Sequence, residues 1–119
     1  MQNYHELKVW RKAHDLTLNI YQVTESFPES ERYGLTSQIR RASASIPTNL
    51  AEGSGRGSKA ELAQFAQISA GSTSEVEYLL ELSLSLGYIK KAAPDDLIPN
   101  VQEIRKMLTA LIRILRTKG

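Results

Sequence analysis

The sequence predicts an all-α protein, an antiparallel up-down-up-down four-helix bundle that forms a single domain over residues 1–119. Three observations support this fold class. Four segments carry apolar residues at spacings of three and four, the period of an amphipathic helix. Short runs rich in proline or glycine separate these segments, and no segment alternates as a strand does. Short connections make consecutive helices antiparallel neighbours.

The first helix is predicted by a continuous apolar stripe and is expected to end before Pro28. The stripe consists of Val9, Ala13, Leu16, Ile20, Val23 and Phe27. A second stripe on the same helix is semi-polar and aromatic, and it consists of Trp10, His14, Thr17 and Tyr21. The combined width predicts burial on more than one side.

The second helix is expected to have Ser30 as its N-cap and to continue through Pro47. The helical phase is kept on both sides of that proline by Leu35, Ile39, Ala42, Ile46 and Leu50. Because a proline removes one backbone hydrogen bond without breaking this phase, we predict one kinked helix, not two. The turn-forming run Gly53–Ser58 then ends it.

The third helix is expected over most of residues 59–86, between a capping box formed by Ser58 with Glu61 and a C-terminal Gly87. Small residues around Ala70 and Gly71 leave room for another helix backbone to approach.

The fourth helix shows a heptad-like seam, and Pro94, Asp95 and Asp96 precede it. The seam consists of Val101, Ile104, Leu108, Leu111 and Leu115. Three more apolar residues, Met107, Ile112 and Ile114, fall off this seam. A helix in a monomeric bundle needs only one apolar face, so this excess predicts a subunit interface.

Composition narrows the class of protein. The chain has no cysteine, which excludes disulfides, thiol catalysis and cysteine-ligated zinc. No apolar run approaches the length of a membrane span, and the opening residues MQNYHELKVW lack the apolar stretch of a signal peptide. We therefore expect a soluble cytoplasmic protein with no membrane partner.

Charge is unevenly distributed although the net charge is only +2. Residues 61–89 contain four glutamates and no lysine or arginine, while the segments on either side are basic. Two interpretations remain open: complementary helix faces inside the bundle, or a basic outer surface that meets a polyanion.

Few groups are suited to catalysis. His5 and His14 are the only histidines and lack the spacing of a metal site, while Asp95-Asp96 and Glu29 with Glu31 fit helix N-termini. No phosphate-binding lysine motif or dinucleotide glycine motif occurs. We predict no catalytic residue, no metal site and no cofactor.

Phosphate contacts are predicted at two places. In the run GSGRGS, glycines let successive N–H groups face one anion, the following helix N-terminus favours negative charge, and Arg56 and Lys59 add positive charge. A plain solvated connection is the alternative. Arg40 and Arg41 diverge from the core face of the second helix, and we expect one to pair with a glutamate of the third helix while the other faces outward.

Asn49 lies near the core face of the second helix, where a hydrogen-bonded amide would fix bundle register. Exposed basic clusters are also expected on the first and last helices, at Lys8, Arg11 and Lys12, and at Arg105, Lys106, Arg113, Arg116 and Lys118.

The stretch Tyr33–Gly53, YGLTSQIRRASASIPTNLAEG, resembles the hallmark of bacterial four-helix bundle proteins encoded by intervening sequences of 23S rRNA genes. Leu7–Trp10, Phe27-Pro28, Gly55-Arg56, and Ala70–Ser72 followed by Glu75 extend the resemblance over nearly the whole chain. It implies a bundle that assembles into a homopentamer. It also implies similarity to the accessory variability protein of diversity-generating retroelements, which binds nucleic acid and partners a reverse transcriptase.

The resulting expectation is a non-enzymatic homo-oligomer that binds RNA or DNA phosphates without reading sequence, through Arg40, Arg41, Arg56 and Lys59. One rival is a protein–protein adaptor that does not touch nucleic acid. The other is a hydrolytic enzyme such as a nuclease, which the sparse histidines disfavour.

Overall fold

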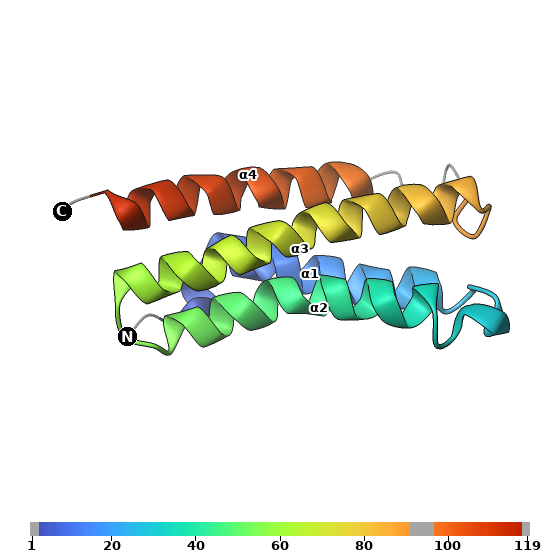
Figure 1. The fold of residues 1–119 in the computed structure, drawn as a ribbon, viewed down its shortest axis with the longest axis horizontal. Coiled ribbons are helices and arrows are strands. Elements are labelled where there is room, and N and C mark those ends of the chain that lie inside the picture. Colours follow the sequence, from blue (N-terminus) through green and yellow to red (C-terminus); the bar gives the residue numbers. More distant parts are fainter. Residues whose placement is uncertain (1–2, 91–96, 118–119) are drawn as a thin grey trace.

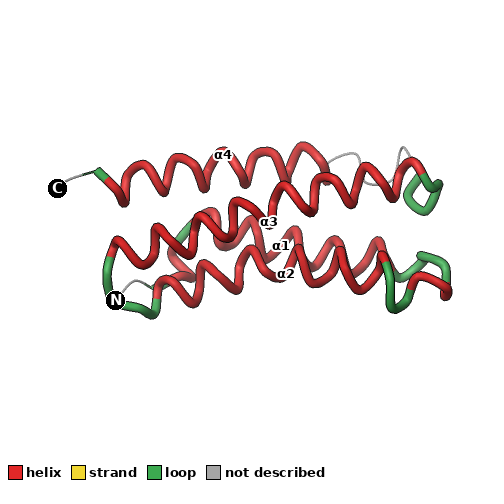
Figure 2. Tube along the Cα trace, viewed as in Figure 1, coloured by secondary structure: helices red, strands yellow, loops and turns green. Residues whose placement is uncertain are grey.

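The computed structural model describes residues 3–90 and 97–117 and confirms the four-helix architecture. The bundle measures 48 × 23 × 19 Å, and each helix runs in the direction opposite to the one before it (Figure 1). The helices are α1 (Lys8–Thr24), α2 (Leu35–Ser54), α3 (Lys59–Ser85) and α4 (Leu97–Arg116). Two short 3-10 helices, η1 (Tyr4–Glu6) and η2 (Glu29–Glu31), precede α1 and α2. The described ranges contain helices and turns and no strand (Figure 2).

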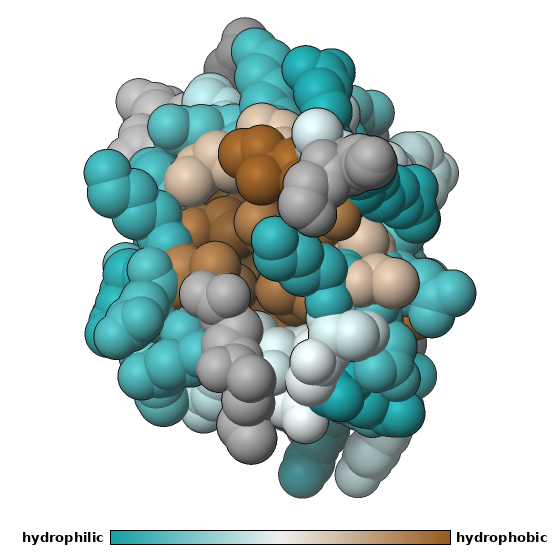
Figure 3. Space-filling model, turned by 90° about the vertical axis from the view of Figure 1, so that its left-hand side faces the viewer, coloured by the Kyte–Doolittle hydropathy of each residue, from teal (hydrophilic) through white to brown (hydrophobic). Residues whose placement is uncertain are grey.

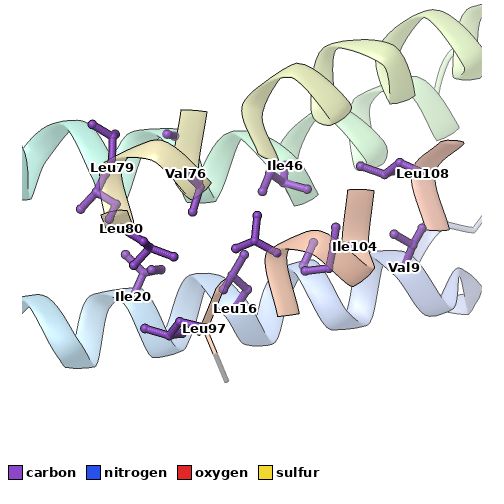
Figure 4. Close-up of a cluster of buried hydrophobic side chains, with 14 of the residues drawn as sticks. Val9, Leu16, Ile20, Ile46, Val76, Leu79, Leu80, Leu97, Ile104 and Leu108 are labelled. Carbon is purple, nitrogen blue, oxygen red and sulfur yellow. The ribbon is translucent and has the colours of Figure 1, made fainter. Parts of the chain in front are cut away.

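All four helices contribute to one apolar core. Figure 4 shows Leu16 and Ile20 of α1, Ile46 of α2, Val76 of α3 and Ile104 of α4 turned toward one another, and all are fully buried. α1 and α3 each pack against both α2 and α4. Removal of this apolar surface from water is the main force that holds the helices together.

The predicted kink residue Pro47 lies inside one continuous α2, as expected. Because proline has no N–H, the carbonyl of Ser43, four residues earlier, loses its partner within the helix. The hydroxyl of Thr17 on α1 lies 3.0 Å from that carbonyl and 3.0 Å from the Ala13 carbonyl of its own helix, so the two carbonyls share its one hydrogen, and Ser43 is fully buried. A neighbouring helix therefore supplies the hydrogen bond that the proline removes.

The predicted capping signals at both ends of α3 are confirmed, and the helix spans Lys59–Ser85, within the predicted range. The Glu61 N–H donates to Ser58 Oγ at 3.2 Å, and the Ser58 hydroxyl donates to Glu61 Oε1 at 3.0 Å. At the other end Gly87 has a φ of 80°, which glycine adopts readily, and the N–H of Tyr88 reaches back to Ser83 O at 3.0 Å.

The predicted seam of α4 is buried up to Leu108. Beyond it Leu111 still packs against the core but is half-buried, as is Leu115, and the buried position is Ile112, which the prediction placed off the seam. A straight helix has 3.6 residues per turn and drifts away from a seven-residue repeat, so the buried stripe moves to the next position.

The predicted N-cap Ser30 is also wrong, because it lies in η2 and α2 begins at Leu35. The N-cap residue is Gly34, which has no side chain to accept a hydrogen bond, and Glu31 supplies the acceptor: its Oε1 accepts the Leu35 N–H at 3.0 Å, and its Oε2 accepts the Tyr88 hydroxyl at 2.9 Å. Likewise α1 ends at Thr24, before Phe27, although Phe27 remains in the core. Pro94, Asp95 and Asp96 lie outside the described residues.

Candidate nucleic-acid interface

The turn between α2 and α3 carries two of the predicted phosphate contacts. Since α2 extends to Ser54, the turn is shorter than the glycine-rich run and consists of residues 55–58. Arg56 forms an ion pair of 3.0 Å with Glu52, and its guanidinium lies 4.9 Å from the centre of the Phe65 ring. Its side chain is still 47% exposed. Lys59 is exposed and forms no ion pair within the described part of the chain.

The capping box changes what the α3 N-terminus can bind. Ser58 already satisfies the Glu61 N–H, and the Glu61 carboxylate lies beside the same turn. A carboxylate there takes the favourable position that a phosphate would otherwise occupy. Attraction for an external phosphate therefore depends on the side chains of Arg56 and Lys59, not on a backbone cradle.

A small pocket of about 220 Å³ opens beside this turn. It is lined by Gly53, Ser54, Gly57, Ser58, Lys59, Leu62 and Leu115. Ser54 is 2% exposed, and its hydroxyl has no hydrogen-bond partner among the described residues. Figure 3 views this end of the bundle and shows apolar side chains at the centre with hydrophilic ones around them.

Arg40 and Arg41 differ sharply in their surroundings. Arg40 Nε donates to Thr24 Oγ1 at 2.8 Å and Nη2 donates to the Tyr21 carbonyl at 3.1 Å. Its guanidinium also lies 4.5 Å from the centre of the Tyr21 ring. Arg40 thus binds the C-terminal end of α1, where a cation is favoured, and the expected pairing with a glutamate of α3 is wrong. Arg41 is exposed, and its nearest polar contact is Ser37 Oγ at 3.4 Å.

The four predicted contact residues do not form one site. Arg56 and Lys59 lie at the turn, whereas Arg41 lies thirteen residues before the end of α2. At 1.5 Å per residue this places them about 20 Å apart along the bundle. One ligand can reach both places only if it is extended along α2.

Antiparallel topology brings other cations to the end that carries the turn. The α2–α3 turn, the end of α4 and the start of α1 all lie toward the same end of the bundle, with the start of α1 set back from the turn (Figure 1). We call the exposed cations gathered there the basic end: Lys8, Arg11, Arg56, Lys59, Arg113 and Arg116. The signal was present in the separate clusters of α1 and α4, but only the bundle order places them at the same end as the turn. At the opposite end lie Glu25, Glu29, Glu31 and Glu81, together with two exposed cations, Lys90 and Arg32, the second of which pairs with Glu29.

Other charges are used inside the bundle, as the first interpretation of the charge pattern predicted. Glu77 of α3 accepts from Gln102 Nε2 at 2.8 Å and from Arg105 Nη1 at 2.6 Å. These two bonds from α4 lower the pKa of the Glu77 carboxyl below its usual range. Lys12 pairs with Glu103 at 3.2 Å. Arg105 and Lys12 are therefore engaged between helices.

Asn49 takes part in a hydrogen-bonded chain between α2 and α3. Its amide donates to the Ser45 carbonyl at 2.8 Å and to Ser45 Oγ at 3.0 Å. Ser45 Oγ in turn lies 2.8 Å from Ser72 Oγ. The predicted amide contact is thus within α2, and the serine pair makes the crossing between helices.

Across residues 3–90 and 97–117, histidines and carboxylates nowhere gather in a group that suits a metal ion. Nor does any helix there combine the length and apolar character needed to cross a membrane.

The chain resembles known proteins over nearly its whole length. The sequence model of the family described as 23S rRNA-intervening sequence protein matches residues 5–110. A crystal structure of a protein of unknown function, from the S23 ribosomal protein family of Bacteroides thetaiotaomicron, is similar with a TM-score of 0.79 and 25% sequence identity. The similarity covers 88% of this chain and 95% of that one. Comparison with curated proteins finds no match.

Proposed function

The chain belongs to the 23S rRNA-intervening sequence protein family, and we propose that it is a non-enzymatic homo-oligomer that binds the phosphates of RNA or DNA. The observation that carries this proposal is the basic end, where six exposed cations from three parts of the chain gather. Among the described residues the carboxylates at that end are Glu6, Glu52 and Glu61, and Glu52 is paired with Arg56.

Binding of this kind would be electrostatic. Lysine and arginine displace the counterions of a polyanion, which gives affinity that falls as salt is raised and that depends little on sequence. Arg41 supplies a second contact for a nucleic acid that extends along α2. Arg40 contributes less, because its guanidinium is already hydrogen-bonded to α1.

The test is fluorescence anisotropy with labelled RNA and DNA oligonucleotides at about 50 and 200 mM salt. We expect Lys59→Glu to weaken binding several-fold and Arg56→Glu/Lys59→Glu to weaken it at least tenfold, with a shallower salt dependence. The matched control is Lys90→Glu, the same charge reversal at an exposed site of the opposite end. Salt-insensitive affinity, or no binding at about 50 mM salt, would refute the proposal.

Oligonucleotide length adds a second readout. Because Arg41 lies about 20 Å from the turn, Arg41→Glu is expected to weaken binding of a strand that spans both places and to leave a strand of two or three nucleotides unaffected. Equal effects on both strands would place Arg41 within the same contact as the turn.

A protein–protein adaptor is the alternative function, and exposed apolar side chains favour it. Ile68 and Tyr78 on α3 are 51% and 58% exposed, and Ile114 on α4 is 69% exposed. In a pull-down, an adaptor would retain a protein partner, such as a reverse transcriptase, after nuclease treatment. The nucleic-acid proposal expects nuclease to release the bound material.

A further inference from the structure

An aromatic cluster forms where η1 meets the first turns of α1. It consists of Tyr4, His5, Trp10 and His14. The Trp10 and His14 rings are stacked, with centres 5.0 Å apart and planes within 10°. Tyr4 and His5 are stacked at 4.1 Å, and both meet Trp10 edge to face at 5.0 and 5.2 Å.

The aromatic cluster is held in place by the core, against which Trp10 packs, and by Asn3, which hydrogen-bonds to His5. Trp10 is half-buried and packs against the core. Asn3 Oδ1 accepts the backbone N–H of His5 at 3.1 Å and lies 3.0 Å from His5 Nδ1, which fixes both the short helix and the imidazole. His5 itself is exposed, and its only aromatic contacts within the described residues are Tyr4 and Trp10. A further planar ring can therefore stack on this cluster with little loss of side-chain freedom.

One cation borders the cluster. The Arg11 guanidinium lies 5.3 Å from the centre of the Trp10 ring. Lys8 is exposed in the same turn of α1 but projects from another side of the helix than Trp10, because residues two apart do not share a face. Arg11 also belongs to the basic end, and a phosphate held by it would place its own base near the rings.

We propose that the aromatic cluster stacks the bases of single-stranded nucleic acid while the basic end holds its phosphates. The proposal rests on the proposed function and adds a preference for unpaired strands. Stacking on aromatic rings is tolerant of sequence and needs a base whose face is free. In a duplex the base faces are covered by their neighbours, so a duplex would contact the cations alone.

Trp10 makes the proposal directly measurable, because it is the only tryptophan in the chain. The probes are a single-stranded oligothymidylate and a DNA duplex with the same number of phosphates. We expect the single strand to quench Trp10 emission and the duplex to leave it nearly unchanged. The variants are His5→Ala and Tyr4→Ala/His5→Ala, and the control is Tyr33→Ala, an 86% exposed tyrosine at the opposite end. Circular dichroism confirms that each variant is folded.

The outcomes separate this inference from the proposed function. Quenching by the single strand, with affinity reduced roughly tenfold in Tyr4→Ala/His5→Ala and duplex binding unchanged, supports the inference. Binding of the single strand without quenching, or with equal affinity in that variant, overturns the inference and leaves phosphate binding intact. Absence of binding by either probe at about 50 mM salt overturns both. Trp10 emission that changes on diluting the protein alone would show that a second copy covers the cluster, and this also overturns the inference.

Discussion

Two adjacent arginines, Arg40 and Arg41, have different roles although they are the same type of residue. Arg40 satisfies the end of α1 through Thr24 and the Tyr21 carbonyl, whereas Arg41 projects into solvent. We expect Arg40→Ala to lower the free energy of unfolding by about 1–2 kcal/mol, since it removes two hydrogen bonds from a charged group. Arg41→Ala should change it by less than about 0.5 kcal/mol. Urea denaturation measures both, and equal values would contradict the assigned roles.

The Glu77 carboxylate gives a pH-dependent prediction. Its pKa is lowered in the folded state by hydrogen bonds from Gln102 and Arg105. A group with a depressed folded pKa stabilises the fold above its ordinary pKa of about 4.3, and that stabilisation is lost as pH falls through the folded value. We expect Glu77→Gln to be less stable than the native chain by about 1 kcal/mol at about pH 7 and to approach it near pH 3.

Thermal unfolding of both chains at the two pH values tests the role of Glu77. Glu75→Gln is the control, because Glu75 is exposed on the same helix and forms no ion pair within the described residues. A stability difference for Glu77→Gln that does not change with pH would contradict the ionic role.

The role of Arg40 could not be derived from the sequence. Its partners lie sixteen and nineteen residues earlier, and they are available only because α1 ends at Thr24. The apolar stripe continues to Phe27, which is buried although it lies beyond the helix. Apolar spacing therefore could not show that α1 ends at Thr24. Charge and spacing alone left Arg40 equivalent to Arg41.

At the scale of helices, Thr17 and Pro47 are expected to be energetically coupled. Thr17→Val leaves the buried Ser43 carbonyl without its donor from α1, and we expect a cost of about 1–3 kcal/mol. Pro47→Ala restores a backbone N–H in α2 that can donate to the same carbonyl. In the Pro47→Ala background the cost of Thr17→Val should therefore fall by at least about 1 kcal/mol. A double-mutant cycle by urea denaturation measures the coupling, and additive effects would show that the carbonyl does not depend on Thr17.

The sequence predicted that the four helices exist more reliably than it predicted where each helix begins and ends. The periodicity of apolar residues predicted all four helices. Capping residues also located both ends of α3, because Ser58 with Glu61 at the start and Gly87 at the end are signals that can be read from neighbouring residues alone. The start of α2 was missed because the Glu31 carboxylate supplies its capping acceptor, and Tyr88, fifty-seven residues away, helps to hold that carboxylate. The end of the α4 stripe was missed because the buried face of a straight helix drifts only slightly with each turn from the face that a heptad repeat predicts, so the two patterns separate only near the end of the helix.

At the scale of the whole molecule, topology creates the candidate site. The cations of α1, the turn and α4 are more than forty residues apart in sequence, and the alternating order of helices collects them at one end while Glu25, Glu29, Glu31 and Glu81 lie at the other. The sequence could indicate each basic cluster separately. Their convergence required the bundle order, and the internal use of Arg40, Lys12 and Arg105 required the tertiary contacts.

A homo-oligomer would carry several copies of the basic end, and a substitution at Ile114 tests whether the chain assembles. We propose a homo-oligomer, with a pentamer as the expected size, in which the exposed side chain of Ile114 is covered by another copy. Ile114→Glu is then expected to give monomers, because a buried unpaired charge is costly. Met107 is a poorer choice, since it packs partly against the core of its own bundle. Thr109→Glu adds the same charge on another side of α4 and serves as the control.

Mass in solution and nucleic-acid affinity should change together in this experiment. Light scattering should show multimers for the native chain and Thr109→Glu, and folded monomers for Ile114→Glu. Because linked sites bind a long polyanion by avidity, the monomer should bind long RNA at least tenfold more weakly and a short oligonucleotide almost as well. A native chain that is monomeric would refute assembly. Multimers that persist in Ile114→Glu would place the contact on another surface, with the exposed Ile68 and Tyr78 of α3 as the next positions to change.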